Sequence, residues 1–191
     1  DVLDIFSESQ PTILRDDIET IAVQFDFLGI NSYSPAFVQA MDADESKLGL
    51  RSLKPDELQA RGYDLTHMNW PVYPDAFRQL LIEVNERYHP KKILITENGA
   101  AYPDQIEHGQ VNDLARVRYI EAHIQAMNEA IDQGVPVRGY FIWSLMDNFE
   151  RALGDEKRFG IIYGNYETLE RIPKASFYHY RSILAKHSNV K

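Results

Sequence analysis

The stretch KKILITENGAAYPD, residues 91–104, decides how the rest of the chain is interpreted. Apolar strand-forming residues at 93–95 give way abruptly to TENG at 96–99. This pattern is typical of a buried strand that ends in a tight turn. The carboxylate of Glu97 therefore stands where the strand ends. Such a charge can simply mark the point at which the chain reaches solvent, because surface carboxylates are common.

Composition and charge restrict the class of protein. The chain has 191 residues, enough for one domain or part of one. Its 44% apolar and 26% charged residues are typical of a globular protein. A net charge of -9 argues against a nucleic-acid partner, whose phosphates call for a basic face. No apolar run approaches the roughly 20 residues that span a bilayer, so we expect no membrane role. The absence of cysteine fits a reducing compartment, and we expect a cytoplasmic protein.

Several familiar chemistries have no counterpart in the sequence. None of the ten glycines belongs to a GxSxG, GxGxxG or P-loop pattern. The six histidines are scattered, with no HxxxH or HExxH pair, and zinc-binding cysteines are absent. We therefore predict neither a metal site nor a cofactor.

Two further apolar runs predict strands, FDFLGINSYS (25–34) and VRGYFIWSLMDN (137–148). Three other segments share the 3.6-residue apolar periodicity of helices. They run from Pro74 to Pro90, from Asn112 or Asp113 to Gly134, and onward from Pro173. The order is a helix followed by strand–helix three times. That alternation predicts an α/β fold with parallel strands buried on both faces.

Polar and aromatic residues gather where each predicted strand ends. They are Asn31 and Tyr33 on the first strand, Glu97 on the second, and Trp143, Asp147, Asn148 and Glu150 after the third. Ligands meet such sheets at the carboxyl ends of the strands, so we expect these side chains to form one site for a sugar or another polar ligand. The alternative is that Trp143 fills the core and that Asp147 and Asn148 only cap a turn, since loops favour Asp and Asn.

Four segments resemble the family-one glycoside hydrolases, the β-glucosidases and their relatives, in the order of that family. ITENG (95–99) resembles the nucleophile motif. DFLGINSYSP (26–35), HMNWPVYPDAFRQLL (67–81) and the stretch from GYFIWSLMDNFE to KASFYHY (139–180) resemble three other family segments. The resemblance implies the C-terminal portion of a (β/α)8 TIM barrel, about strands 6–8 with their helices. Residues 1–191 would then be the C-terminal part of one domain whose N-terminal part is absent from the chain.

The resemblance also implies a retaining β-glycosidase that acts on β-glucosides or related oligosaccharides. Such enzymes use two carboxyl groups about 5–5.5 Å apart, one as nucleophile and one as acid/base. Glu97 matches the nucleophile, Tyr33 the tyrosine that orients it, and Asn31 the asparagine beside it. Four further positions match the family's sugar-binding surface. They are Glu150 for the distal hydroxyls, Trp143 as the stacking platform, Phe159 in the same pocket, and Trp70 on the leaving-group side.

Two departures from the family pattern leave alternatives open. The family's acid/base glutamate lies in an NEP motif, which does not occur here. Arg151 replaces a tryptophan that donates to a sugar hydroxyl, and a guanidinium prefers carboxylate or phosphate. The alternatives are an inactive carbohydrate-binding or structural barrel fragment, and a 6-phospho-β-glycosidase relative. The phospho-sugar branch usually changes the position of Glu150 as well, and here that glutamate is retained.

These inferences predict how the chain behaves by itself. Three parallel strands cannot close a barrel, and the outer edges of the first and third would present unpaired backbone groups. We therefore expect the chain alone to be inactive. Its expected partners are the N-terminal part of the barrel or, failing that, further copies of itself in a homo-oligomer.

Overall fold

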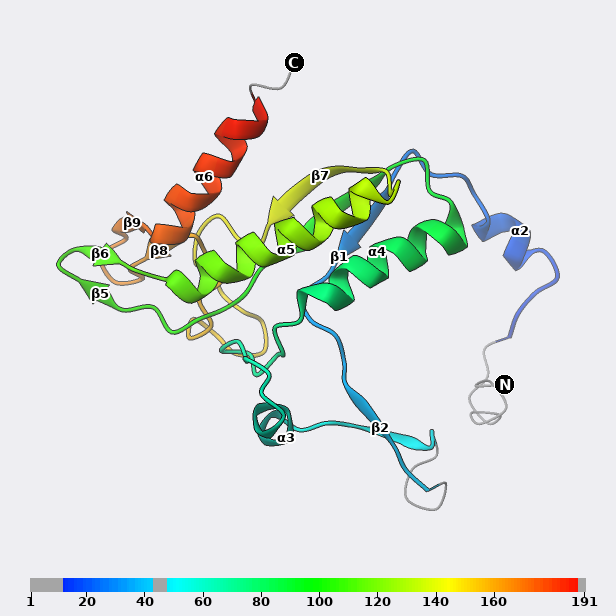
Figure 1. The fold of residues 1–191 in the computed structure, drawn as a ribbon, viewed down its shortest axis with the longest axis horizontal. Helices are drawn as coiled ribbons and strands as arrows, with labels where there is room; N and C mark the ends of the chain where they lie inside the picture. Colours follow the sequence, from blue (N-terminus) through cyan, green and yellow to red (C-terminus); the bar gives the residue numbers. More distant parts are fainter. Residues whose placement is uncertain (1–11, 43–47, 189–191) are drawn as a thin grey trace.

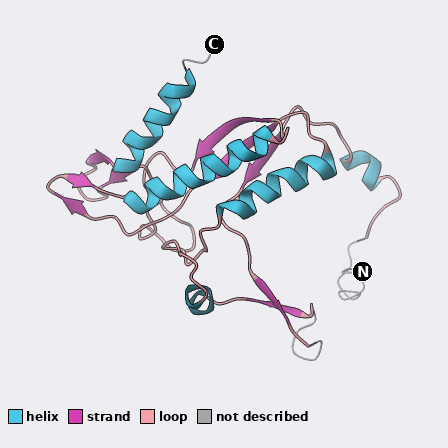
Figure 2. Ribbon diagram, viewed as in Figure 1, coloured by secondary structure: helices cyan, strands magenta, loops and turns pink. Residues whose placement is uncertain are grey.

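A three-stranded parallel sheet forms the centre of the protein (Figures 1 and 2), seen in a computed structural model that describes residues 12–42 and 48–188. Its strands lie in the order β1 (Leu28–Asn31), β4 (Ile93–Asn98) and β7 (Val137–Ile142). Both pairings are parallel, as the sequence predicts. The strands are shorter than the predicted runs, because residues at the ends of those runs, apolar as well as polar, leave the sheet and form loops.

Two long helices link the three strands and cover one face of the sheet. Helix α4 (Pro74–Tyr88) connects β1 to β4, and α5 (Leu114–Asp132) connects β4 to β7. Figure 1 shows them side by side in front of the sheet. Proline begins α4 at a position where its missing N–H costs nothing, and His89 ends that helix in the left-handed conformation. These two helices confirm the predicted ones.

The core lies between these helices and the sheet. Its buried members come from both helices, from β4, and from the start of β7 and the turn before it. They are Phe77, Leu81, Ile93, Ile95, Ala126, Ala130, Val135 and Val137. A second cluster joins α5 to the last helix, α6 (Ala175–Ser188), through Ile120 and Ile124. The predicted helix after Pro173 is thus present and packed.

The remaining elements are short, and none of them except α2 was anticipated from the sequence. They are helices α2 (Asp17–Ile21) and α3 (Pro55–Ala60), and three antiparallel strand pairs: β2 (Val38–Ala40) with β3 (Leu50–Ser52), β5 (Ile106–Glu107) with β6 (Gln110–Val111), and β8 (Ile162–Gly164) with β9 (Arg171–Pro173). Strands of two or three residues are too short to show a periodicity. Helix α2 is all that the described residues contain of the helix predicted before the first strand.

The face of the sheet opposite α4 and α5 is open in the described part of the chain. Asn31 and Thr96 are exposed there, and Phe141 is 56% exposed. The prediction that the strands are buried on both faces is therefore wrong for these residues. The physical reason is that both crossover helices pack on the same face. In a closed barrel the opposite face is the interior, which side chains of all eight strands fill.

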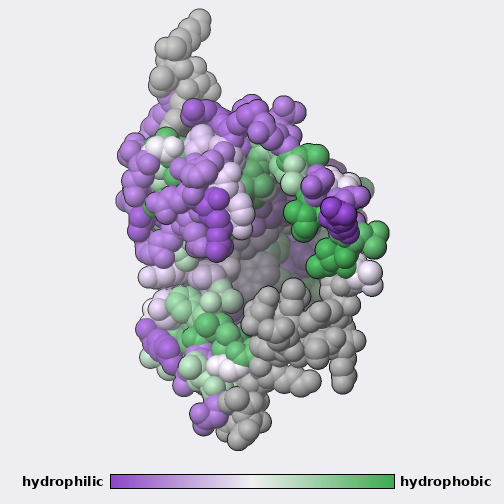
Figure 3. Space-filling model, turned by 90° about the vertical axis from the view of Figure 1, so that its right-hand side faces the viewer, coloured by the Kyte–Doolittle hydropathy of each residue, from purple (hydrophilic) through white to green (hydrophobic). Residues whose placement is uncertain are grey.

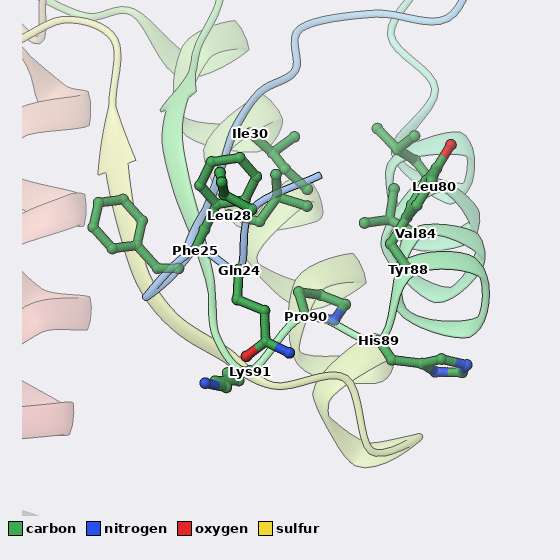
Figure 4. Close-up of a pocket in the computed structure, with 12 residues that line it drawn as sticks. Gln24, Phe25, Leu28, Ile30, Leu80, Val84, Tyr88, His89, Pro90 and Lys91 are labelled. Carbon is green, nitrogen blue, oxygen red and sulfur yellow. The ribbon is translucent and has the colours of Figure 1, made fainter. Parts of the chain in front are cut away.

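A hydrophobic hollow of about 540 Å³ lies at the outer edge of β1. Figure 4 shows Leu28 and Ile30 of β1 on one side of this hollow and Leu80 and Val84 of α4 on the other. Hydrophobic residues surround a hollow on the side of the molecule shown in Figure 3. Because β1 has a paired neighbour only on its β4 side among the described strands, this hollow marks the free edge of the sheet.

No helix in the described ranges is long and apolar enough to cross a membrane.

Candidate active site at the carboxyl edge of the sheet

Glu97 and Tyr33 meet where β1 and β4 end. The strand register places Asn31 opposite Glu97, and the Ser32 amide donates to the Glu97 carbonyl oxygen over 2.9 Å. The Tyr33 hydroxyl then donates to Oε2 of Glu97 over 2.5 Å. Burial raises the pKa of Tyr33 above its usual value, and the hydrogen bond to the Glu97 carboxylate raises that pKa further. The phenol consequently remains a hydrogen-bond donor to this carboxylate well above neutral pH, where an ordinary tyrosine ionises.

Asn98 ties together the ends of all three strands. Its side-chain amide donates to the Ser32 backbone carbonyl oxygen over 2.7 Å. Its backbone carbonyl oxygen accepts from the Trp143 backbone amide over 2.9 Å. The side chain is fully buried. At Gly99, a Cβ atom would lie 1.8 Å from the Trp143 carbonyl oxygen, so only glycine permits this approach. Asn98 and Gly99 of the motif are thus required by the packing of the strand ends, independently of the Glu97 carboxylate.

An aromatic wall stands beside this pair. The ring of Tyr33 lies 5.5 Å from that of Trp70 and 6.1 Å from that of Phe159, between centroids. Trp70 and Phe159 are themselves 6.1 Å apart. Phe159 is almost fully buried, whereas Trp70 is partly exposed. The structure therefore brings two predicted sugar-pocket residues from distant loops to Tyr33.

The loop after β7 brings Trp143 and Glu150 to the same edge. Trp143 follows β7 directly, is partly exposed, and forms a cis peptide bond with Ser144. Its exposure argues against the alternative that it only fills the core. Glu150 is half-buried, and its charge adds to the influences that raise the pKa of Tyr33. The charges of Glu97 and Glu150 thus both raise the pKa of the same phenol.

Asn31 and Arg151 have less direct connections to this group. Asn31 is exposed, and its side-chain oxygen accepts from Thr96 Oγ1 over 2.6 Å rather than contacting Glu97. Arg151 is exposed and forms no hydrogen bond or ion pair with the residues that the structure describes. Their predicted sugar contacts stay predictions.

A buried ion cluster, which the sequence analysis did not anticipate, holds the loops around the site. It consists of Asp104, Asp113, Asp147, Arg116, Arg158 and Lys174. Lys174 donates to both Asp104 and Asp147, and Arg116 donates to both Asp104 and Asp113. These contacts join the loops after β4 and β7 to the beginnings of α5 and α6.

This cluster corrects the placement of Asp147, which the sequence grouped with the candidate site residues. Its carboxylate accepts from Arg158 over 2.7 Å, from Lys174 over 2.8 Å, and from the Gly160 amide over 2.9 Å. All of these contacts are internal to the fold. Asn148 donates to Ser144 Oγ over 2.9 Å. Asp147 therefore joins distant segments of the fold rather than capping a turn, whereas the Asn148 contact lies within the loop.

A carboxylate at the carboxyl edge of a parallel β/α sheet lies where (β/α)8-barrel enzymes place their active sites. Comparison with known proteins identifies the family: the model for glycosyl hydrolase family 1 matches residues 4–189, so the chain belongs to that family.

Relatives from two Thermotoga species show the extent of the similarity. The 1,4-beta-D-glucan glucohydrolase of Thermotoga neapolitana and beta-glucosidase A of Thermotoga maritima are each 40% identical over 184 residues, which cover 96% of this chain. A solved family 1 b-glucosidase from Thermotoga maritima is 38% identical, with a TM-score of 0.86 over 100% of this chain and 41% of that one. The chain spans about 40% of the length of the curated relatives it matches. These findings confirm the predicted family and show that the fold is a portion of a (β/α)8 barrel.

Proposed function

We propose that the protein acts, within a complete barrel, as a retaining β-glycosidase on β-linked glucosides, with Glu97 as its nucleophile. The hydrogen bond from Tyr33 to Glu97 at the carboxyl edge of the sheet is the observation that carries this proposal. The names of the relatives, which include beta-glucosidases, support the substrate class.

The hydrogen-bond pattern of Glu97 suits a nucleophile. Tyr33 occupies Oε2, and Oε1 accepts no hydrogen bond from the described residues. Oε1 would attack the anomeric carbon as the glycosidic bond breaks, and an acid group would protonate the departing oxygen. Water would then add to the anomeric carbon of the glycosyl-enzyme, lose its proton to the same group, and release Glu97.

The surrounding residues suit a bound sugar. The partly exposed indole of Trp143 offers a face on which a pyranose ring can stack. Glu150 offers an acceptor for hydroxyl groups, and the aromatic wall of Trp70 and Phe159 closes the side next to Tyr33. Among these residues, only the Glu150 carboxylate is a strong acceptor of hydrogen bonds from sugar hydroxyl groups.

We place the acid/base on a part of the barrel outside these 191 residues, because the chain carries no NEP motif. The described sheet contributes three strands, whereas a closed barrel needs eight. The free edge of β1 and its hydrophobic hollow would then receive the preceding β/α unit. The chain by itself would neither protonate the leaving group nor activate water.

The proposal is tested by complementation followed by labelling. The chain is co-expressed with the segment that precedes the matched region in beta-glucosidase A of Thermotoga maritima. The assembled protein is then treated with an activated 2-fluoro β-glucoside. The fluorine should slow hydrolysis of the glycosyl-enzyme, so peptide mapping should find the label on Glu97.

Two variants complete this test. Glu97→Gln keeps the size of the side chain and should abolish both labelling and turnover. Glu121→Gln is the matched control, because Glu121 is an exposed carboxylate on α5 that lies outside the site. A label on another carboxylate, with Glu97 unmodified, would refute the assignment.

A further inference from the structure

Two buried side chains hold the Ser32–Tyr33 segment, and the proposed reaction assigns neither of them a role. The Asn98 amide donates to the Ser32 carbonyl oxygen over 2.7 Å, and the Tyr119 hydroxyl donates to the Tyr33 carbonyl oxygen over 2.8 Å. Asn98 is fully buried and Tyr119 is 1% exposed. A partly buried carbonyl that lost its donor would still bear a desolvation cost, so both bonds constrain the segment.

These side chains form one connected network. The Asn98 amide also donates to the Tyr119 hydroxyl over 3.2 Å, and the Tyr140 hydroxyl donates to Asn98 Oδ1 over 2.6 Å. The ring of Tyr119 stacks on that of His123, with 3.9 Å between centroids and an interplanar angle of 24°. The orientation of the Tyr119 hydroxyl is therefore determined by packing as well as by hydrogen bonds.

The position of Tyr33 depends on this network because Tyr33 lies beyond the end of β1. The ladder to β4 continues past Asn31 only through the Ser32 amide, which bonds to the Glu97 carbonyl oxygen. After that bond, the backbone of Tyr33 is held by Tyr119 on α5. The side chain of Tyr33 then reaches back to Glu97.

We propose that Tyr119, together with Asn98, is a positioning residue that aligns the Tyr33 hydroxyl with Glu97. Both residues would act through the backbone of Ser32 and Tyr33, to which their side chains donate. The inference rests on the proposed role of Glu97 as nucleophile. Its first test uses the geometry alone, and only its second test requires turnover.

The first test is an NMR titration of the 191-residue chain labelled with ¹³C at the tyrosine Cζ atoms. The titratable groups whose charge raises the pKa of Tyr33 are Glu97, Tyr119 and Glu150. With the hydrogen bond intact, the Tyr33 signal should remain that of the phenol while exposed tyrosines ionise near a pH of about 10. Tyr119→Phe removes one hydroxyl and keeps the ring. It should loosen Tyr33 and make Tyr33 ionise at a lower pH than in the unmodified chain.

Tyr180→Phe is the matched control for this titration. Tyr180 is a partly buried tyrosine whose hydroxyl also donates to a backbone carbonyl, that of Tyr140, over 3.2 Å. The Tyr180→Phe substitution should leave the titration of Tyr33 unchanged. An identical Tyr33 titration in the Tyr119→Phe variant and the unmodified chain would overturn the inference. So would an equal change in both variants, because that would indicate a general loosening of the fold.

The second test is a double-mutant cycle in the assembled enzyme with a nitrophenyl β-glucoside. Loss of one buried hydrogen bond corresponds to roughly a three- to tenfold change in rate, so Tyr119→Phe should lower kcat/KM by about that factor. In a Tyr33→Phe background the same substitution should have little further effect, because its route to Glu97 is already removed. Additive losses would overturn the inference. Retained turnover in Glu97→Gln would refute the nucleophile instead, and the Tyr33 titration would still report on the positioning.

Discussion

Replacing Gly99 with alanine tests the close approach of β4 and β7 at the candidate site. An alanine Cβ would lie 1.8 Å from the carbonyl oxygen of Trp143 and 2.9 Å from its carbonyl carbon. Ordinary contact begins at 3.4 Å, so the two backbones would have to separate by the difference, 1.6 Å. The hydrogen bond of 2.9 Å from the Trp143 amide to the Asn98 carbonyl oxygen cannot survive that separation.

The expected loss of stability follows from these contacts. Overpacking costs about 1–3 kcal/mol, and a buried backbone group left without its partner costs about 1–3 kcal/mol more. Gly29→Ala is the matched control. Neither glycine has a positive φ, so both variants gain the same small benefit from a less flexible unfolded chain. At Gly29, however, the nearest atom is the Thr96 methyl group at 3.2 Å, which can move.

The assay is urea unfolding of the chain at one fixed concentration, followed by the fluorescence of its two tryptophans, Trp70 and Trp143. We expect Gly99→Ala to be destabilised by about 2–6 kcal/mol relative to the unmodified chain. Gly29→Ala should change the stability by no more than about 1 kcal/mol. Equal stabilities of the two variants would refute the argument that glycine is required for the approach of the two backbones.

Three further predictions concern pH, specificity and assembly. Burial lowers the pKa of His123 from 6.5 to about 4, against the raising effect of the Tyr119 carbonyl that its ring contacts. The unfolded chain therefore binds a proton below pH 6.5 that the folded protein takes up only near pH 4. Stability should fall across that window by up to about 3 kcal/mol, and urea unfolding of His123→Phe should lack this part of the pH dependence. Arg151→Trp should raise kcat/KM for a nitrophenyl glucoside in the assembled enzyme by several-fold to about tenfold, since an indole donor adds one hydrogen bond; a decrease would point to phosphorylated or acidic sugars. The chain alone should be inactive and should elute in gel filtration with light scattering as a species larger than its 22.1 kDa monomer, whereas a stable monomer with a cooperative melt would contradict the expectation that the chain needs a partner to cover its open sheet.

The long elements were predictable from local patterns, and the short ones were not. Helices α4 and α5 carry apolar residues over several turns, and prolines or glycine mark their ends. The strand pairs β2–β3 and β5–β6 contain two or three residues per strand, and their pairing depends on the turn between them. The open face of the sheet was mispredicted because an apolar run does not reveal which segments cover it.

The site shows the same division between local and long-range information. The ITENG motif identifies Glu97, and the strand order predicts that Tyr33 lies near it. The contact of Tyr119 with Tyr33 joins residues 86 positions apart, and no local pattern reports it. Asn98 offered one signal, because it is a polar residue directly after the strand core, but its burial is visible only in the structure.

The buried ion cluster has a consequence for the order in which the chain can fold. Its three carboxylates and three cations balance, but they come from segments that stretch from Asp104 to Lys174. An intermediate that buried the cluster before α6 docked would lack Lys174 and would hold three carboxylates against only two cations, Arg116 and Arg158, and a buried carboxylate charge that is not balanced is costly. The loops around the site should therefore stay open until α6 arrives and then close in one step. The last helix, which contributes nothing to the proposed chemistry, would in this way control when the catalytic edge takes its shape.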